Sequence, residues 1–324
     1  MQKTKQKPLQ FIFETAMLAA LFIIIQYAIT VGLINEYYQI NLASLCINIM
    51  LAVSLNLING FTGQLSLGHA GFMAVGAYAA AVMTTLLNQP FLVGILTACA
   101  AAALAGLIIG VPTLKLRGDY LAIATLGFGE IIRVVLQNID YIGGPAGIQG
   151  IPVYTNWPWL FGGVVLTIVV IVNLINSSYG RAIISVREDE VAAELMGINT
   201  TRYKVLAFVV GALFAGMAGA LYAHYFYIIK PDNFNFMKSF DLLVMVVLGG
   251  LGSTTGAIIA AAFITVLTAV LQSFPAVRMI FYALILIIVM IYRPEGLMGN
   301  KELSRKSWGR IWGERNGPSE HKQS

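Results

Sequence analysis

Charged side chains are scarce in this sequence. Only 11% of its 324 residues are Asp, Glu, Lys or Arg, whereas 58% are hydrophobic, and the mean hydropathy is +0.79. Soluble domains carry roughly 25% charged residues. A water-soluble protein of this length could not cover so much apolar surface with so few charges. The composition therefore predicts that lipid is the solvent for most of the chain.

The sequence has only two cysteines and no phosphate-binding loop of the kind found in ATPases. Cys46 and Cys99 both lie inside apolar runs, which argues against a disulfide framework or a metal site. No G-x-x-x-x-G-K-[ST] phosphate loop occurs, because the glycine-rich stretch 249–253 lacks the lysine. There is also no convincing nucleophile–base pair. We therefore expect a chain that is not an enzyme, with no catalytic residue, metal or cofactor of its own.

Apolar runs long enough to cross a bilayer follow one another along the chain. A membrane helix needs about 17–25 such residues. One further run, 240–251, is too short to cross alone and leads into a glycine-rich turn, so we predict a broken or re-entrant segment near 240–256. The expected fold is an all-α polytopic membrane protein with about ten membrane segments. The longer runs cover residues 15–34, 40–58, 65–87, 91–111, 120–139, 159–176, 205–228, 256–273 and 278–292.

The basic residues are distributed unevenly between the two sides that these segments define. With the N-terminus inside, 16 of the 20 basic residues lie inside, and the exceptions are Arg133, Lys230, Lys238 and Arg278. This asymmetry follows the positive-inside rule and predicts that both termini are cytoplasmic. It also accounts for the net charge of +5 without a nucleic-acid partner. The expected parts are a cytoplasmic tail (1–14), a transmembrane domain (15–292) and a second cytoplasmic tail (293–324).

The longest interior cytoplasmic segment, 177–204, is predicted to contain a short helix. Ser185 and Glu188 fit a capping box, and the acidic residues that follow suit the positive end of the helix dipole. Gly197 stands where a C′ glycine ends a helix. The pattern predicts a helix over 186–196, which is far too short to span a membrane.

One side of this predicted helix is apolar. Val191, Ala192, Leu195 and Met196 cluster there, with acidic residues elsewhere. Ala192 and Ala193 would leave a flat patch that the backbone of another protein could approach. The residues alone leave two alternatives open, namely docking of a second protein or attachment to the membrane surface.

The same segment carries a resemblance to a known family. Residues 185–204 resemble the coupling loop of ABC-importer permeases of the branched-chain amino-acid family, which is recognised as Glu-Ala-Ala followed three residues later by Gly. Ala192, Ala193 and Gly197 match this pattern, while Val191 occupies the Glu position and Glu190 lies one place earlier. The resemblance implies that ATPase subunits dock on residues of this loop. The implied coupling residues are Arg187, Glu190, Ala192, Ala193, Leu195 and Gly197.

Two further stretches extend the resemblance over most of the chain, from about residue 40 to 299. Residues 57–72 are similar to a signature shared by both permeases of the family. Residues 114–133, followed by Gly-Gly-Pro-Ala-Gly-Ile at 143–148, resemble the LivM-type member rather than its LivH-type partner.

The resemblance implies a partner for each step of transport. A LivH-type permease would complete the pore, LivG-like and LivF-like ATPases would bind ATP and Mg²⁺ beneath it, and an extracytoplasmic binding protein would deliver leucine, isoleucine or valine. The chain would be a multi-pass subunit in the cytoplasmic membrane of a bacterium or archaeon, surrounded by lipid. Two alternatives stay open: a sister importer of urea or short amides, and a stand-alone secondary transporter or channel.

Polar and glycine residues near residue 64 are candidates for the transport path. A freed helix N-terminus and polar groups could face a substrate carboxylate there. The alternative is that the glycines are helix–helix contacts and that the histidine is an interhelical hydrogen-bonding residue. The candidates are Gln64, Ser66, Gly68, His69 and Gly71.

Glu130 and Arg133 are two charges inside a predicted span. They are three residues apart and share a helix face. Charges inside a membrane are costly and normally face the protein interior or each other. The spacing fits an ion pair between the two, and the alternative is a polar lining of the path.

Overall fold

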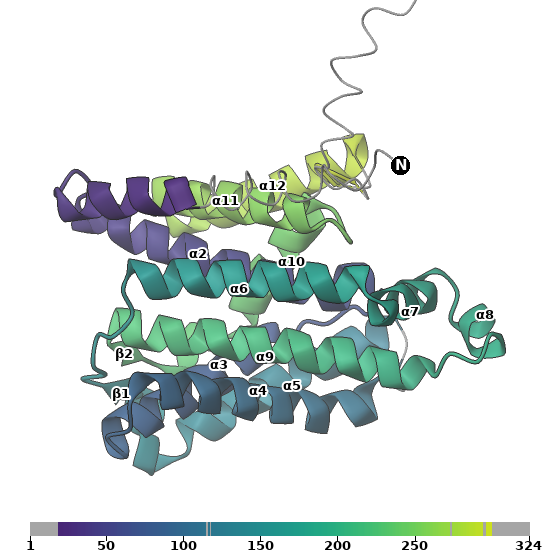
Figure 1. Cartoon of the computed structure of the whole chain (residues 1–324), viewed down its shortest axis with the longest axis horizontal. Helices are drawn as coiled ribbons and strands as arrows, with labels where there is room; N and C mark the ends of the chain where they lie inside the picture. Colours follow the sequence, from purple (N-terminus) through teal and green to yellow (C-terminus); the bar gives the residue numbers. More distant parts are fainter. Residues whose placement is uncertain (1–18, 115, 117, 273, 294–295, 300–324) are drawn as a thin grey trace, which may run out of the picture.

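The computed structural model describes residues 19–114, 116, 118–272, 274–293 and 296–299. The predicted N-terminal tail, 1–14, lies outside the described residues. So does most of the predicted C-terminal tail, of which only residues 293 and 296–299 are described. Within the described part, the chain is almost entirely helical (Figure 1). The expected all-α class therefore holds apart from one pair of two-residue strands, β1 (Ile148–Gln149) and β2 (Ile228–Ile229), which pair antiparallel.

Five helices are long and apolar enough to cross a membrane, as judged on the described residues. Two of them continue from an α-helix into a π-helical turn, namely α2 into Leu57–Phe61 and α3 into Val82–Leu86. Shorter apolar helices, such as Ala19–Thr30, accompany them. The chain is thus a polytopic membrane protein. The remaining bounds are α2 (Glu36–Asn56), α3 (His69–Ala81), α4 (Phe91–Thr113), α5 (Asp119–Gln137), α6 (Trp157–Asn176), α7 (Ser178–Glu188), α8 (Glu190–Leu195), α9 (Thr200–Phe226), α10 (Phe236–Gly249), α11 (Thr254–Val270) and α12 (Pro275–Tyr292).

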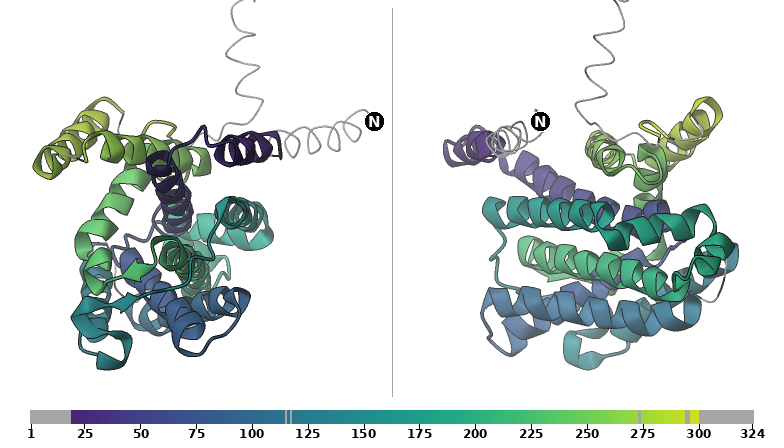
Figure 2. Two further views of the ribbon diagram at one scale, coloured as in Figure 1. Left: turned by 90° about the vertical axis from the view of Figure 1, so that its left-hand side faces the viewer. Right: turned by 45° about the vertical axis from the view of Figure 1, so that its right-hand side comes forward.

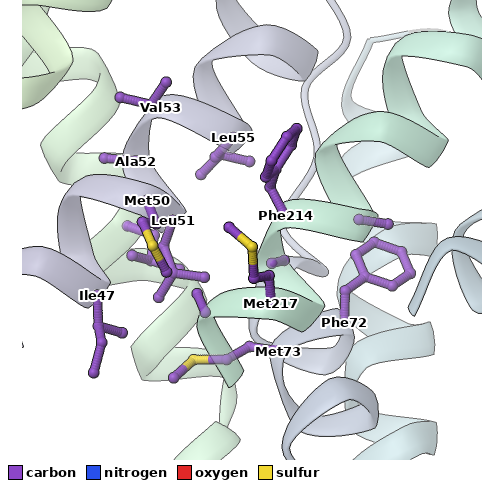
Figure 3. Packing of buried hydrophobic residues seen from close by; sticks show 14 of the residues in the cluster. Ile47, Met50, Leu51, Ala52, Val53, Leu55, Phe72, Met73, Phe214 and Met217 are labelled. Atoms are coloured by element: carbon purple, nitrogen blue, oxygen red, sulfur yellow. The ribbon is translucent and has the colours of Figure 1, made fainter. Parts of the chain in front are cut away.

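Helix α9 lies at the centre of the bundle and contacts α2, α3, α4 and α6. Small residues allow these backbones to approach closely. A Cβ atom added at Gly76 of α3 would lie 2.3 Å from Cα of Gly216 in α9, so only glycine fits at that contact. Larger buried side chains of α2, α3 and α9 form the hydrophobic core of the bundle, including Leu55, Phe72 and Met217 (Figure 3). Close contact between small residues is how membrane helices associate when lipid offers no hydrophobic driving force.

The helices α10 and α11 contain the interruption that the sequence predicts near 240–256. Helix α10 has 14 residues, which is too short to cross a bilayer, and it ends at Gly249. The turn that follows places Gly250 and Gly252 at φ values of 109° and 88°, which favour glycine. Helix α11 then starts at the N-cap Ser253, whose hydroxyl accepts a hydrogen bond from the Gly256 backbone N–H. The predicted break is confirmed as two short helices joined by a turn.

The arrangement separates two ends of the molecule. The short helices α7 and α8 lie at one end of its long axis, and the strands β1 and β2 lie at the other (Figure 1). Helices α11 and α12 stand on one side of the bundle, and α4 and α5 stand on the opposite side (Figure 2). Most of the predicted site residues lie in or next to α7 and α8, in the loop 62–68, or at the start of α3.

Candidate functional site

The segment between α6 and α9 forms two helices, and not the single helix predicted over 186–196. The predicted N-cap, Ser185, is wrong: it lies inside α7, and its hydroxyl donates to the Ala182 carbonyl at 2.8 Å. The break falls at Asp189, whose carboxylate accepts hydrogen bonds from the backbone N–H groups of Val191 and Ala192 at 2.9 and 3.1 Å. Asp is as good an N-cap as Ser. The N-cap of α8 is therefore Asp189, a residue that the sequence pattern did not single out.

The C-terminal end of α8 is where the sequence predicts it. Gly197 has a φ of 83°, and its N–H donates to the Glu194 carbonyl at 2.9 Å. The next N–H, of Ile198, reaches the Ala193 carbonyl at 3.0 Å. These bonds satisfy carbonyls at the helix end, as a C′ glycine normally does.

Helix α8 and the residue after it present an apolar face to their surroundings. Val191, Leu195 and Met196 are 59%, 84% and 82% exposed. Ala192 is exposed as well, whereas Ala193 is only 4% exposed and faces the protein. The predicted flat patch of two alanines is therefore wrong for Ala193. The predicted apolar side made of Val191, Ala192, Leu195 and Met196 is confirmed as exposed.

An ion pair attaches α8 to the membrane part of the protein. The Lys204 ammonium in the first turns of α9 donates to the Glu190 carboxylate at 2.6 Å, and the Lys204 side chain is 10% exposed. The Thr200 hydroxyl also donates to the Glu194 carboxylate at 2.8 Å. Glu190 therefore holds α8 in place from within the chain. No local pattern predicts this pair, because its members lie on different helices.

Arg187 points into the protein, away from the exposed face of α8. A Cβ atom added at Gly63 would lie 3.1 Å from Cγ of Arg187, and one added at Gly252 would lie 2.5 Å from its Nη1. Both glycines have positive φ, at 71° and 88°. The side chain of Arg187 thus joins α7 to two non-helical segments, the loop after Phe61 and the turn between α10 and α11.

The loop 62–68 has no regular secondary structure and leads into α3, which starts at His69. Asn59 holds it in place, because its side chain accepts from the Ser66 N–H at 3.1 Å and donates to the Ser66 carbonyl at 3.3 Å. The Leu67 N–H donates to the Thr125 hydroxyl of α5 at 3.0 Å. Non-helical backbone is tolerated at membrane depth only where protein or a cavity satisfies it.

Several buried polar atoms of this loop have no hydrogen-bond partner among the described residues. They are both side-chain amide atoms of Gln64, the hydroxyl of Ser66 and Nδ1 of His69. The other imidazole nitrogen of His69 lies 2.8 Å from the Ser54 hydroxyl of α2. Buried polar groups are nearly always paired. Three of the predicted path residues thus carry unsatisfied groups within six residues of sequence.

Gly68 and Gly71 lie against α5. A Cβ atom at Gly68 would lie 2.5 Å from the Thr125 carbonyl oxygen, and one at Gly71 would lie 2.9 Å from Cα of Gly129. These two glycines therefore let the start of α3 approach α5 closely, as the alternative of helix–helix contacts predicts.

Glu130 and Arg133 form the ion pair that their spacing predicts, with 2.7 Å between Oε2 and Nε. Arg133 also bonds to Asp232 at 3.1 Å, and Gln137 donates to the same Asp232 oxygen at 2.8 Å. The group joins α5 to the loop before α10, near the end opposite α8. It is distant in the fold from the α8 end that holds Gln64 and Arg187.

A half-buried lysine that was not among the predicted site residues joins three helices. The Lys238 ammonium, in the first turn of α10, donates to the Asn48 side chain of α2 at 2.9 Å. Asn48 in turn donates to the Thr265 hydroxyl of α11 at 3.0 Å. The sequence signal for this contact was a lysine next to the apolar run 240–251, because a charged side chain in a membrane segment normally has a partner.

Comparison with known proteins identifies the family. A family model described as "Branched-chain amino acid transport system / permease component" matches residues 37–290. The chain belongs to this family. Its members are permease components of a transport system, so this permease is not an enzyme, and the resemblance seen in its motifs is confirmed.

Named relatives agree with this assignment. The high-affinity branched-chain amino acid transport system permease protein LivM of Salmonella typhimurium is 37% identical over 78% of this permease and 68% of its own length, and that of Escherichia coli gives the same values. The permease protein LivH of Salmonella typhimurium is 35% identical, over 40% of this permease and 42% of its own length. The chain is therefore similar over most of its length to LivM and over a shorter stretch to LivH.

Proposed function

We propose that this permease is the LivM-type half of an ATP-driven importer of leucine, isoleucine and valine. Its similarity to LivM proteins over most of the chain supports the cargo class. The observation that carries the proposal is the α8 end, where an exposed apolar face is held to the membrane bundle by a nearly buried ion pair. We propose that this face docks a separate ATPase subunit and does not lie on the membrane surface.

The proposed topology has ten membrane segments with both termini in the cytoplasm of a bacterium or archaeon. The distribution of basic residues supports this orientation. The position of α8 and of the β1–β2 pair at opposite ends of the long axis is compatible with it. In this orientation α8 lies in the cytoplasm, and lipid surrounds exposed apolar residues such as Leu96, Leu104 and Ile108 of α4.

In the proposed importer, separate subunits complete the pore, bind ATP and deliver the amino acid. A LivH-type permease completes the pore, and the similarity of one stretch to LivH supports a pore built from two related subunits. LivG-like and LivF-like ATPases bind ATP and Mg²⁺ and dock on Val191, Leu195 and Met196 of α8. An extracytoplasmic binding protein delivers the amino acid. This chain itself binds no cofactor.

The proposed mechanism is alternating access driven through α8. Closure of the ATPases moves α8, and its ion pair to Lys204 passes the motion to α9. Arg187 passes the same motion to the loop 62–68 and to the α10–α11 turn, because its side chain is wedged against Gly63 and Gly252. Motion of these two non-helical segments would open and close the path beside Gln64 and His69.

Reconstitution of the full importer tests this function. With the LivH-type subunit, both ATPases and the binding protein in proteoliposomes, we expect radiolabelled leucine to accumulate only when ATP is supplied. Leucine uptake that persists on a gradient alone, without the ATPases, would contradict the proposal. Competition by urea or a short amide instead of valine would assign the permease to the sister class of cargo.

A further inference from the structure

A small cavity separates α7 and α8 from the loop 62–68. It has a volume of about 240 Å³, or space for roughly eight waters at about 30 Å³ each. Pockets for drug-sized ligands begin at about 300 Å³, so this one suits a smaller solute. Its walls come from the loop after α2, the start of α5, the end of α7 and the Glu190–Lys204 ion pair.

Two of the lining side chains are ready to bind a ligand. Gln64 is only 5% exposed, and both its amide oxygen and its amide nitrogen have no hydrogen-bond partner among the described residues. Arg187 lines the same cavity, and no hydrogen bond or ion pair to another described residue satisfies its guanidinium. Unpaired polar groups in a nearly buried position cost free energy unless something fills the space with partners.

The lining carries charges of both signs. Arg187 and Lys204 stand beside Glu188, Asp189 and Glu190. A guanidinium can hold a carboxylate with two parallel hydrogen bonds, and a primary ammonium suits carboxylate and amide oxygens. A simple anion would use only one half of this lining, whereas a zwitterion would use both. The head group of an α-amino acid is a small zwitterion.

We propose that this cavity is a binding site for a free α-amino acid, reached from the cytoplasmic side. Arg187 and the amide N–H groups of Gln64 bind the carboxylate, and Glu188 and the amide oxygen of Gln64 accept from the ammonium. This site rests on the proposed function, since it takes the same class of solute as the transport path. It lies between α8 and the loop 62–68, so a bound amino acid would contact both parts that Arg187 joins.

Binding to the purified permease pair, without ATPases or binding protein, tests the site directly. We expect leucine to bind to the pair in nanodiscs, and leucinamide and 4-methylpentanoate to bind about 10-fold or more weakly, because each lacks one of the two charged groups. Arg187→Met should weaken leucine binding about 10-fold or more, and Arg187→Lys should weaken it less. Arg181→Met is the matched control, since Arg181 is exposed on the same helix and does not line the cavity. Leucine binding unchanged in Arg187→Met would overturn the proposal.

Cysteine labelling gives a second readout that leaves Arg187 intact. In a chain with Cys46 and Cys99 replaced by Ala, Leu116→Cys places a thiol in the cavity wall and Leu195→Cys places one on the exposed face of α8. In inside-out vesicles, we expect leucine but not leucinamide to slow maleimide labelling at position 116 and to leave position 195 unchanged. Equal labelling of Leu116→Cys with and without leucine would overturn the site, even if ATP-driven uptake is normal. Protection without any ATP-driven uptake would instead contradict the proposed function.

Discussion

The contact between α3 and α9 differs sharply from the loop that leads into α3. At the α3–α9 contact, glycine meets glycine, and buried apolar side chains of the same two helices, such as Phe72 and Met217, belong to one hydrophobic core. In the loop 62–68 and at the first residue of α3, four buried polar atoms have no partner among the described residues. The first region is optimised for packing. The second gives up stability, and proteins keep such groups mainly where function uses them.

The largest effect is expected at the glycine contact. Gly76→Val should destabilise the fold by about 3 kcal/mol, because its Cβ would clash with the backbone of Gly216 and neither helix can move away cheaply. Size-exclusion chromatography and thermal unfolding of the purified protein measure this. Gly162→Ala is the control, since no atom lies within 4 Å of its added Cβ. A Gly76→Val protein as stable as the control would refute the close contact.

The ion pair that holds α8 should show an intermediate effect. Lys204→Met leaves the Glu190 carboxylate without its 2.6 Å donor in a mostly buried position, so we expect a loss of about 2 kcal/mol in unfolding free energy. ATP-driven leucine uptake should fall further than stability explains, because α8 loses its attachment. The double variant Glu190→Gln with Lys204→Met should recover part of the stability but none of the uptake. Recovery of both would mean that the pair has no role in coupling.

The loop should respond in the opposite direction. Ser66→Ala removes a buried hydroxyl that has no partner, so we expect a gain of about 1 kcal/mol in unfolding free energy. We also expect slower leucine uptake in the reconstituted importer, since the same hydroxyl is proposed to face the path. Ser54→Ala is the matched control, because the Ser54 hydroxyl has partners and its loss should destabilise. A destabilised Ser66→Ala protein would show that this hydroxyl is satisfied in the folded state.

The smallest change in stability is expected on α8. Leu195 is 84% exposed, so Leu195→Ser should change the unfolding free energy by less than about 0.5 kcal/mol. Association with the ATPases should nevertheless weaken, because the variant places a polar side chain in the docking face. Co-purification of the ATPases with the permease pair measures this. Undiminished co-purification would move the docking face away from Val191, Leu195 and Met196.

Sequence patterns predicted much of the fold because membrane helices leave a strong signal. A bilayer forces long uninterrupted apolar runs, so the spans of α2, α4 and α6 could be located from hydropathy alone. The break near Gly250 and the helix end at Gly197 were predictable too, since glycine is favoured where φ is positive.

The sites were harder to predict because they depend on contacts between distant residues. Nothing in the spacing of Arg187 reveals that its side chain reaches Gly63 and Gly252, and nothing local chooses Asp189 over Ser185 as an N-cap. The partners of Lys204 and Lys238 likewise lie on other helices. Only the packed bundle fixes such pairs.

The amino-acid sequence by itself determined that this chain spans a membrane, that its helices break near residue 250, and which family it belongs to, because hydropathy and motif spacing are local properties. The tertiary structure alone decided that Ala193 is buried although Ala192 beside it is exposed. It also decided that Gln64 and Arg187 line one cavity beneath the coupling helices. Burial and shared cavities depend on contacts between residues far apart in the sequence, and these contacts form only when the helices pack.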